Sequence, residues 1–133
     1  MPFIGKVGDT IFLDDTGDGH PYVILTKPNK DGNVAIVNFT GSKHFGWIVT
    51  FRPKDNPKLF TKKCSPNYLD ARLYPLSALL KIAKKPHVKT AFCWENHVKQ
   101  IIIGALQSQH ISMEILSELA AQYPNEAAKY YRN

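Results

Sequence analysis

Residues 8–42 read GDTIFLDDTGDGHPYVILTKPNKDGNVAIVNFTGS, and this stretch gives the clearest indication of the fold class. Three short runs of strand-forming residues alternate with two turns that are rich in Gly, Asp and Asn. The runs span residues 11–13, 22–25 and 34–39. Runs at a spacing of roughly 8–12 residues predict an all-β meander or a small barrel. His20 and Thr40 lie at the borders of these strands, where a small barrel places its working residues.

The part of the chain before Arg72 is rich in Gly, Pro, Asn and Asp, and its apolar runs are short. Short runs flanked by turn residues predict strands rather than helices. Beyond the opening stretch, further extended segments are predicted at 47–51, 59–61 and 69–73. The expected architecture of this part is a small barrel of five or six strands.

The part of the chain after Arg72 carries apolar residues at helical spacing. Three helices are predicted, at 76–83, 90–106 and 113–123. Thr90 and Ser112 are expected to cap the second and third helices, and a short terminal helix is expected beyond them. A length of 133 residues favours one domain, with a barrel in 1–73 and a helical extension in 74–133.

Composition and cysteine usage indicate the compartment. No apolar run is long enough to span a bilayer, and the first residues do not resemble a signal peptide. The two cysteines, Cys64 and Cys93, do not make a disulfide framework and suit a reducing environment. The sequence therefore predicts a cytoplasmic protein that does not enter a membrane.

The positive charge is concentrated in the middle of the chain. The formal net charge is +6, and residues 42–99 alone carry 12 Lys or Arg side chains against 3 Asp or Glu. A basic zone on a small domain attracts polyanions, of which nucleic acid is the commonest. Because Lys-rich solvated faces are also common, charge alone leaves an ordinary basic surface as the alternative.

Motifs for metal or nucleotide chemistry do not assemble in this sequence. Cys93 and His97 are four residues apart on a predicted helix, but two ligands do not complete a zinc site. Cys93 is expected in the core and His97 near the surface, and no metal or other cofactor is predicted. No Gly-rich phosphate-binding motif occurs.

The polar residues that remain suit ribonuclease chemistry that needs no metal. RNA carries its own nucleophile, the 2′-hydroxyl, so the protein must supply a base, an acid and a group that stabilises the phosphorane charge. His20 is the candidate acid or base, because an imidazole changes its charge near neutral pH. Thr40 and Ser42 offer hydroxyl donors. Phosphate contacts are expected from Lys62, Lys63 and Arg72.

Five segments carry a resemblance to a known family. They are VGDTIF at 7–12, HPYVILT at 20–26, VAIVNFT at 34–40, LFTKKCSPNYLDAR at 59–72 and GALQS at 104–108. In order and spacing they resemble the PemK/MazF-like toxins of bacterial type II toxin–antitoxin systems. In that family the second segment opens with Arg-Pro, the third ends in Thr, and the fourth follows F-[IV]-K-H-x-S-x-V-x-Y-x-x-A-R. The resemblance covers most of the chain.

The resemblance implies a mainly β, SH3-like barrel with C-terminal helices, which is an α+β domain overall. It also implies a homodimer that cleaves single-stranded RNA without a metal and is inhibited by a small acidic antitoxin protein. Two positions depart from the family pattern. His20 stands where the family has a catalytic Arg. Lys63 stands where the family has a His directly after the Lys that matches Lys62. An imidazole is a weaker phosphate clamp than a bidentate guanidinium, although Thr40 keeps the matching hydroxyl.

The sequence therefore predicts a toxin-like endoribonuclease. His20 and Thr40 are the expected catalytic residues. Contacts with RNA are expected from Ser42, Lys62, Lys63, Tyr68 and Arg72, with the Tyr68 ring stacking on a base. The alternative is a catalytically inactive barrel that binds nucleic acid or a protein partner, and the departure at His20 favours this alternative.

Overall fold

The computed structural model describes residues 2–13, 20–41 and 49–131, which form an α+β domain. Five antiparallel strands make one sheet in the order β6-β3-β2-β1-β7. They are β1 (Asp9–Leu13), β2 (His20–Ile24), β3 (Asn33–Val37), β6 (Arg72–Pro75) and β7 (Thr90–Phe92). A second sheet of two strands contains β4 (Phe39–Thr40) and β5 (Ser65–Pro66). The first two strands predicted from the opening stretch are confirmed as β1 and β2. The third, predicted at 34–39, corresponds to two successive strands, β3 and β4.

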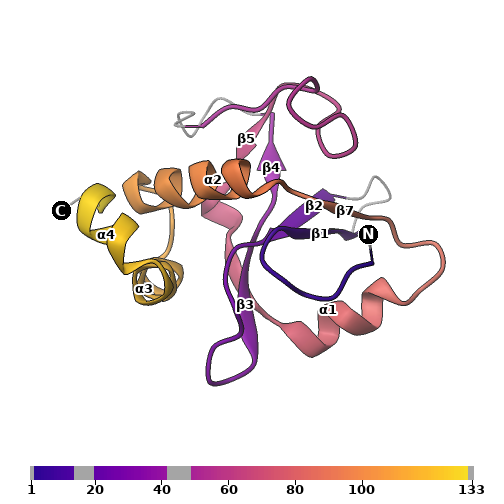
Figure 1. The fold of residues 1–133 in the computed structure, drawn as a ribbon, viewed down its shortest axis with the longest axis horizontal. Coiled ribbons are helices and arrows are strands. Elements are labelled where there is room, and N and C mark those ends of the chain that lie inside the picture. The colour runs from indigo at the N-terminus through magenta and orange to yellow at the C-terminus, as the bar shows by residue number, and fades with distance from the viewer. Residues whose placement is uncertain (1, 14–19, 42–48, 132–133) are drawn as a thin grey trace.

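Helices cover both faces of the large sheet. The helices are α1 (Leu76–Ala83), α2 (Glu95–Gln107), α3 (Met113–Gln122) and α4 (Pro124–Tyr130), and a 3-10 turn spans Tyr68–Asp70. Figure 1 shows α1 on one side of the sheet and α2, α3 and α4 gathered on the other side. Within the described ranges, no helix is both long and apolar enough to cross a membrane.

Strand alternation divides the apolar side chains into two clusters. Val23, Ala35 and Val37 point to the face that α2 and α3 cover, where they join Ile101, Leu106, Ile115 and Leu119. Ile24, Val34 and Ile36 point to the opposite face and pack against Leu79 of α1. The strands of the sheet centre are therefore apolar on both faces, as buried strands are.

The expected closed barrel does not appear in the described part of the chain. β6 and β7 form opposite edges of the five-stranded sheet, and no ladder joins them. The strand predicted at 69–73 begins later, as β6, because Tyr68–Asp70 forms a 3-10 turn. The segment 59–61 is a turn and bend rather than a strand. Of the segment 47–51, the first two residues lie outside the described residues, and Phe51 makes only an isolated bridge to Cys64.

The helix predicted at 90–106 is wrong at its beginning. Thr90–Phe92 pairs with β1 as β7, and the ladder continues through a 2.8 Å hydrogen bond from Cys93 N to Gly8 O. The helix starts only after Trp94, whose carbonyl accepts hydrogen bonds from His97 N and Val98 N. Thr90 is therefore a strand residue and not an N-cap. The part after residue 74 is not purely helical, since it supplies one strand of the sheet.

The other helix boundaries follow the sequence closely. The helix predicted at 76–83 is α1, and the helix predicted at 113–123 is α3. The Ser112 hydroxyl accepts a 3.3 Å hydrogen bond from Ile115 N, as expected of an N-cap. α4 is the short terminal helix.

Candidate functional site

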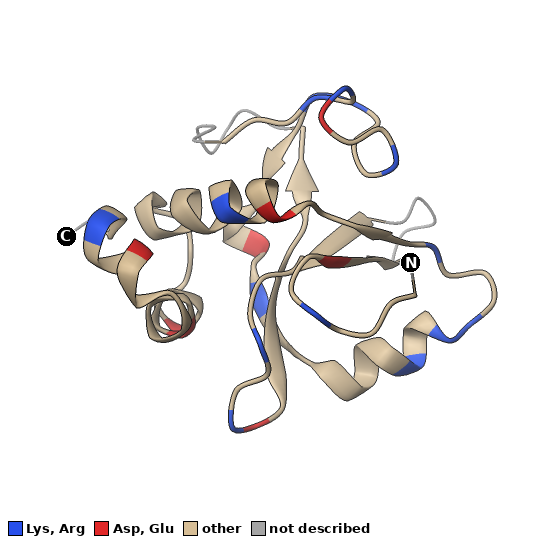
Figure 2. Cartoon of the chain, in the orientation of Figure 1, with Lys and Arg blue, Asp and Glu red and all other residues tan. Residues whose placement is uncertain are grey.

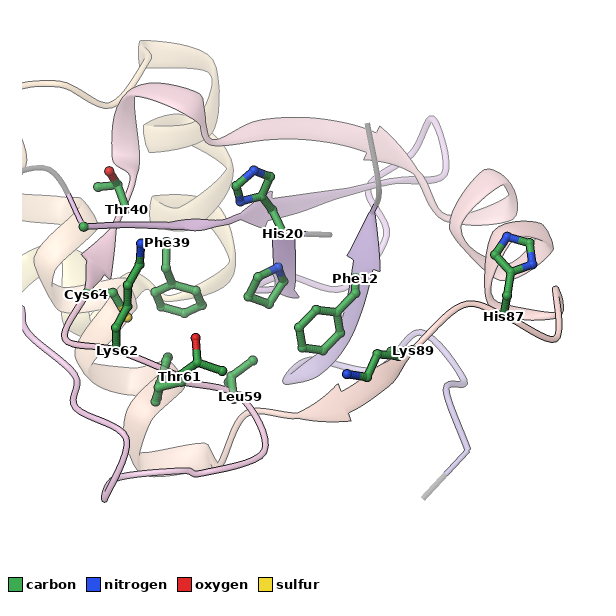
Figure 3. A pocket seen from close by; sticks show the side chains of 13 residues that line it. Phe12, His20, Phe39, Thr40, Leu59, Thr61, Lys62, Cys64, His87 and Lys89 are labelled. Carbon is green, nitrogen blue, oxygen red and sulfur yellow. The ribbon is translucent and has the colours of Figure 1, made fainter. Parts of the chain in front are cut away.

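A cavity of about 490 Å³ opens beside the ends of β1, β2 and β4. Its interior is apolar and is lined by Phe12, Pro21, Phe39, Leu59 and Phe60 (Figure 3). The Phe39 and Phe60 rings meet edge to face with centroids 5.0 Å apart. Phe60 in turn stacks on Phe51 at 4.8 Å. Phe39 and Phe60 are buried and fixed by core packing, so they form a rigid apolar floor, and Phe12 is the partly exposed aromatic residue of the lining.

His20 and Thr40 stand together at the rim of this cavity. The β2–β3 ladder sets Val23 opposite Val37. The ladder ends at this pair, and β4, which follows β3 and belongs to the second sheet, still contacts β2. Figure 3 shows both side chains projecting to the same side of their strands, opposite to Phe39. An exposed imidazole and a half-buried hydroxyl therefore share one edge of the cavity.

The Lys62 side chain reaches across the cavity to this edge. Its Cε and Nζ atoms would each lie 3.6 Å from a Cβ built on Gly41, the residue that follows Thr40. Lys62 is exposed and belongs to the loop between Phe51 and β5. An imidazole, a hydroxyl and an ammonium group from three separate segments of the chain thus line the same cavity.

Two further residues with nitrogen-bearing side chains line the cavity on the side of β7. They are His87 and Lys89, which lie in the connection from α1 to β7. The Lys89 ammonium lies 5.8 Å from the centroid of the Phe12 ring. In Figure 3 Lys89 points toward the interior, whereas the His87 imidazole is turned away from His20. Sequence reasoning missed both residues, and the signal that marks them is the basic run from Lys84 to Lys89.

The lining of the cavity contains no Asp or Glu among the residues that the structure describes. Lys62 and Lys89 line it, and each belongs to a basic segment of the chain. One segment carries Arg52, Lys54, Lys58, Lys62 and Lys63, and the other carries Lys81, Lys84, Lys85 and Lys89. Figure 2 shows Lys and Arg side chains on the loop before β5, which also carries Asp55, and on α1 and the α1–β7 connection, while α2 and α4 carry both signs of charge. The two Lys side chains that line the cavity, Lys62 and Lys89, favour a polyanionic ligand.

The other residues predicted from the sequence lie elsewhere or outside the description. Lys63 is exposed but does not line the cavity. Arg72 forms a 2.7 Å ion pair with Asp70 and lies 5.8 Å from the centroid of the Tyr22 ring, next to a separate hollow. Ser42 lies outside the described residues.

Tyr68 is a core residue in the structure. Its side chain is buried, and its hydroxyl donates a 2.7 Å hydrogen bond to the carbonyl of Ile101 in α2. Burial raises the pKa of this hydroxyl far above its ordinary value. A ring enclosed in this way does not present a face to a base, so the placement gives no support to the expected stacking role.

Cys64 lines the cavity, but its environment does not activate the thiol. Burial raises the pKa of Cys64 to about 11, although the nearby Lys62 acts in the opposite direction. At neutral pH the group is therefore a protonated thiol, which is a poor nucleophile and a poor metal ligand.

The Cys93–His97 pair lies away from the cavity, in the core. Cys93 is buried, as expected, but the expectation that His97 lies near the surface is wrong. The His97 ring packs edge to face on Phe51 at 5.1 Å and stacks on Trp94 at 5.7 Å. Among the described residues, no group of three or more His, Cys, Asp or Glu side chains is placed to hold a metal ion.

Comparisons with protein-family models, with curated proteins and with solved structures found no match to this chain.

Proposed function

We propose that this protein binds single-stranded RNA at the cavity and cleaves it by attack of the 2′-hydroxyl, without a metal. The observation that carries the proposal is that His20, Thr40 and Lys62 line one cavity, together with Lys89 and the partly exposed Phe12. The Phe12 ring suits an unpaired base, and the two Lys side chains suit the phosphate backbone.

The three rim residues have complementary chemical roles in this proposal. His20 takes the proton of the 2′-hydroxyl or delivers one to the leaving 5′-oxygen. The Lys62 ammonium lies beside the charge that develops on the phosphorane, and the Thr40 hydroxyl donates a hydrogen bond to it. The products are a 2′,3′-cyclic phosphate and a 5′-hydroxyl, because the nucleophile and the broken bond belong to the same phosphate.

The resemblance noted in the sequence supports a more specific form of this proposal. In that form the protein is a PemK/MazF-like toxin with an SH3-like barrel, works in the cytoplasm as a homodimer and is inhibited by a small acidic antitoxin. The Lys side chains that line the cavity are positively charged, so they would attract an acidic antitoxin.

A second candidate function is RNA binding without cleavage. One observation favours it specifically. Of the two imidazoles that line the cavity, only His20 stands at the Thr40 edge, while His87 is turned away (Figure 3). Cleavage needs one group that accepts a proton and another that donates one. A single imidazole at the reacting phosphate supplies only one of the two, so the same cavity is also suited to binding without cleavage.

The deciding experiment uses two labelled strands of the same sequence in buffer with EDTA. One is single-stranded RNA, and the other is its 2′-O-methyl analogue, which has no nucleophile. We expect the protein to bind both strands and to cut only the RNA. His20→Ala should lower the cleavage rate by about a hundredfold or more and leave binding of the analogue nearly unchanged.

His110→Ala is the matched control, because His110 is an exposed imidazole in the loop between α2 and α3 and does not line the cavity. Binding of both strands with no cleavage would favour the second candidate function. Absence of binding, with a folded protein by circular dichroism and no copurified partner, would overturn the proposal.

A further inference from the structure

A second hollow of about 380 Å³ adjoins the cavity. The two share Phe12 and His87 in their linings. The second hollow also contains Tyr22, Tyr74, Arg72 and Lys85, and the described residues that line it include no Asp or Glu. A hollow of this size is large enough for a small ligand.

The second hollow lies on the sheet face that carries His20. Side chains alternate along a strand, so Tyr22 shares the face of His20 on β2. Arg72 of β6 is paired with Ile36 of β3, and Tyr22 and Ile36 belong to the same apolar cluster on that face. The face therefore runs from Arg72 past Tyr22 to the rim residue His20.

The chemistry of the second hollow matches that of a nucleotide. Tyr74 is half-buried and supplies an aromatic wall, while Lys85 is exposed and supplies an ammonium group. Arg72 is also exposed, but Asp70 neutralises part of its charge through the 2.7 Å ion pair. Lys85 is thus the cation of this hollow best placed to meet a phosphate.

We propose that the second hollow binds the nucleotide next to the one in the cavity, so that an unpaired RNA strand crosses from one hollow to the other past His87. This inference rests on the proposed function. It specifies the substrate class, because a mononucleotide fills only one hollow and a paired strand cannot place successive bases in two hollows. A single-stranded segment of two or more nucleotides is the preferred ligand.

The experiment measures the binding of 2′-O-methyl oligonucleotides, from a mononucleotide to a hexanucleotide, by calorimetry. The variant is Lys85→Ala, and the control is Lys84→Ala, because Lys84 is an exposed neighbour that lines neither hollow. We expect Lys85→Ala to weaken hexanucleotide binding about fivefold and to leave mononucleotide binding unchanged. Lys84→Ala should change both by less than about twofold.

The Tyr74→Leu variant provides a second measurement at the aromatic wall. It should also weaken the hexanucleotide about fivefold and leave mononucleotide binding unchanged, because a base in the second hollow loses its stacking partner. If Lys85→Ala and Lys84→Ala have equal effects while the hexanucleotide binds tightly, this inference is overturned and the proposed function stands. If no oligonucleotide binds, both fail.

Discussion

The carboxylate of Asp9 holds the first residues of the chain against the sheet. Its Oδ2 atom accepts hydrogen bonds from the backbone amides of Ile4, Gly5 and Lys6 at 2.9, 2.9 and 3.1 Å. Gly8, immediately before it, has a φ of +95°, and a Cβ there would stand 2.8 Å from the carbonyl of Cys93. The Gly-Asp pair of the opening motif is therefore explained by structure, and neither residue is needed in the site.

The buried Cys64 thiol predicts an alkaline loss of stability. Its pKa is raised from 9.0 to about 11 by burial, so the unfolded chain loses this proton first as the pH rises. The contribution of Cys64 to the free energy of unfolding is constant below about pH 9 and falls between about pH 9 and 11. Urea denaturation of the wild type and of Cys64→Ala, at about pH 8 and about pH 10.5, measures this contribution.

We expect the wild type to lose about 2 kcal/mol more than Cys64→Ala between the two pH values. Each protein is compared with itself at the two pH values. The loss of packing caused by Cys64→Ala is the same at both pH values, so it does not affect this comparison. Equal losses in the two proteins would show that Cys64 does not have the raised pKa.

At the scale of elements, helix α2 is held close to the segment that precedes β6. The Tyr68 hydroxyl donates to the carbonyl of Ile101, and Gly104 lies one turn further along the same helix. A Cβ on Gly104 would stand 2.7 Å from Val49 Cγ2 and would also meet the Tyr68 hydroxyl. The small residue of the GALQS segment therefore permits a close approach of the helix.

The Gly104→Ala variant tests this contact. We expect it to destabilise the protein by about 1–2 kcal/mol, because the cost of overpacking exceeds the gain of about 1 kcal/mol in helix propensity. The cost should be smaller in a Tyr68→Phe background, since the ring then lacks the hydroxyl that the new methyl group meets. Chemical denaturation of the wild type, the two single variants and the double variant measures the coupling free energy between positions 104 and 68.

Gly41→Ala is the control for this series, because a Cβ at Gly41 would make only ordinary contacts, at 3.6 Å to Lys62. It should change the free energy of unfolding by less than about 0.5 kcal/mol. A Gly104→Ala variant as stable as the wild type would contradict the close packing of α2.

β7 is an element that was predicted wrongly as part of a helix. Phe92 fits the apolar spacing of the helix that follows and Thr90 resembles an N-cap, so the predicted helix began too early. The pairing partner of these residues is β1, which is distant in the sequence. Ladder hydrogen bonds to a distant strand leave no local signal, and here they outweigh the local helical pattern.

Over the whole molecule, positive charge lies mainly on the loop before β5 and on α1 and the connection that follows it (Figure 2). α3 carries two Glu residues, whereas α2 and α4 each carry one Glu and one Lys. Lys62 and Lys89 line the cavity and Lys85 and Arg72 line the second hollow, so these hollows attract a polyanion and accelerate its association at low ionic strength.

This arrangement predicts a strong salt dependence of RNA binding. If about three phosphates are neutralised, the logarithm of the association constant should fall with the logarithm of the salt concentration with a slope of about −2 for a single strand. Lys62→Ala should reduce the steepness of this slope by about 0.7 and weaken all sequences alike. Fluorescence anisotropy titrations at several salt concentrations, with Lys129→Ala in α4 as control, measure both effects. A slope near zero would contradict electrostatic recognition.

Parts of the candidate site were predictable from single segments. His20 and Thr40 were identified because they end strands whose residues are themselves strand formers, and Lys62 because it belongs to a basic loop. That His20 and Thr40 line the same cavity depends on the contact between β2 and β4, which belong to different sheets. The basic run that contains His87 and Lys89 is visible in the sequence, but only the pairing of β7 with β1 brings it to the cavity.

The strands of the opening stretch, the helices α1 and α3, and the concentration of positive charge can be predicted from the amino-acid sequence alone. These features depend on residues close together in the chain, so their periodicity, caps and composition are visible without a structure. The open sheet of the described residues, the burial of Tyr68 and His97, and the position of Arg72 in a second hollow become visible only in the folded protein. The physical reason is that burial and pairing depend on contacts between distant segments, whose free energy exceeds the local preferences that a sequence displays.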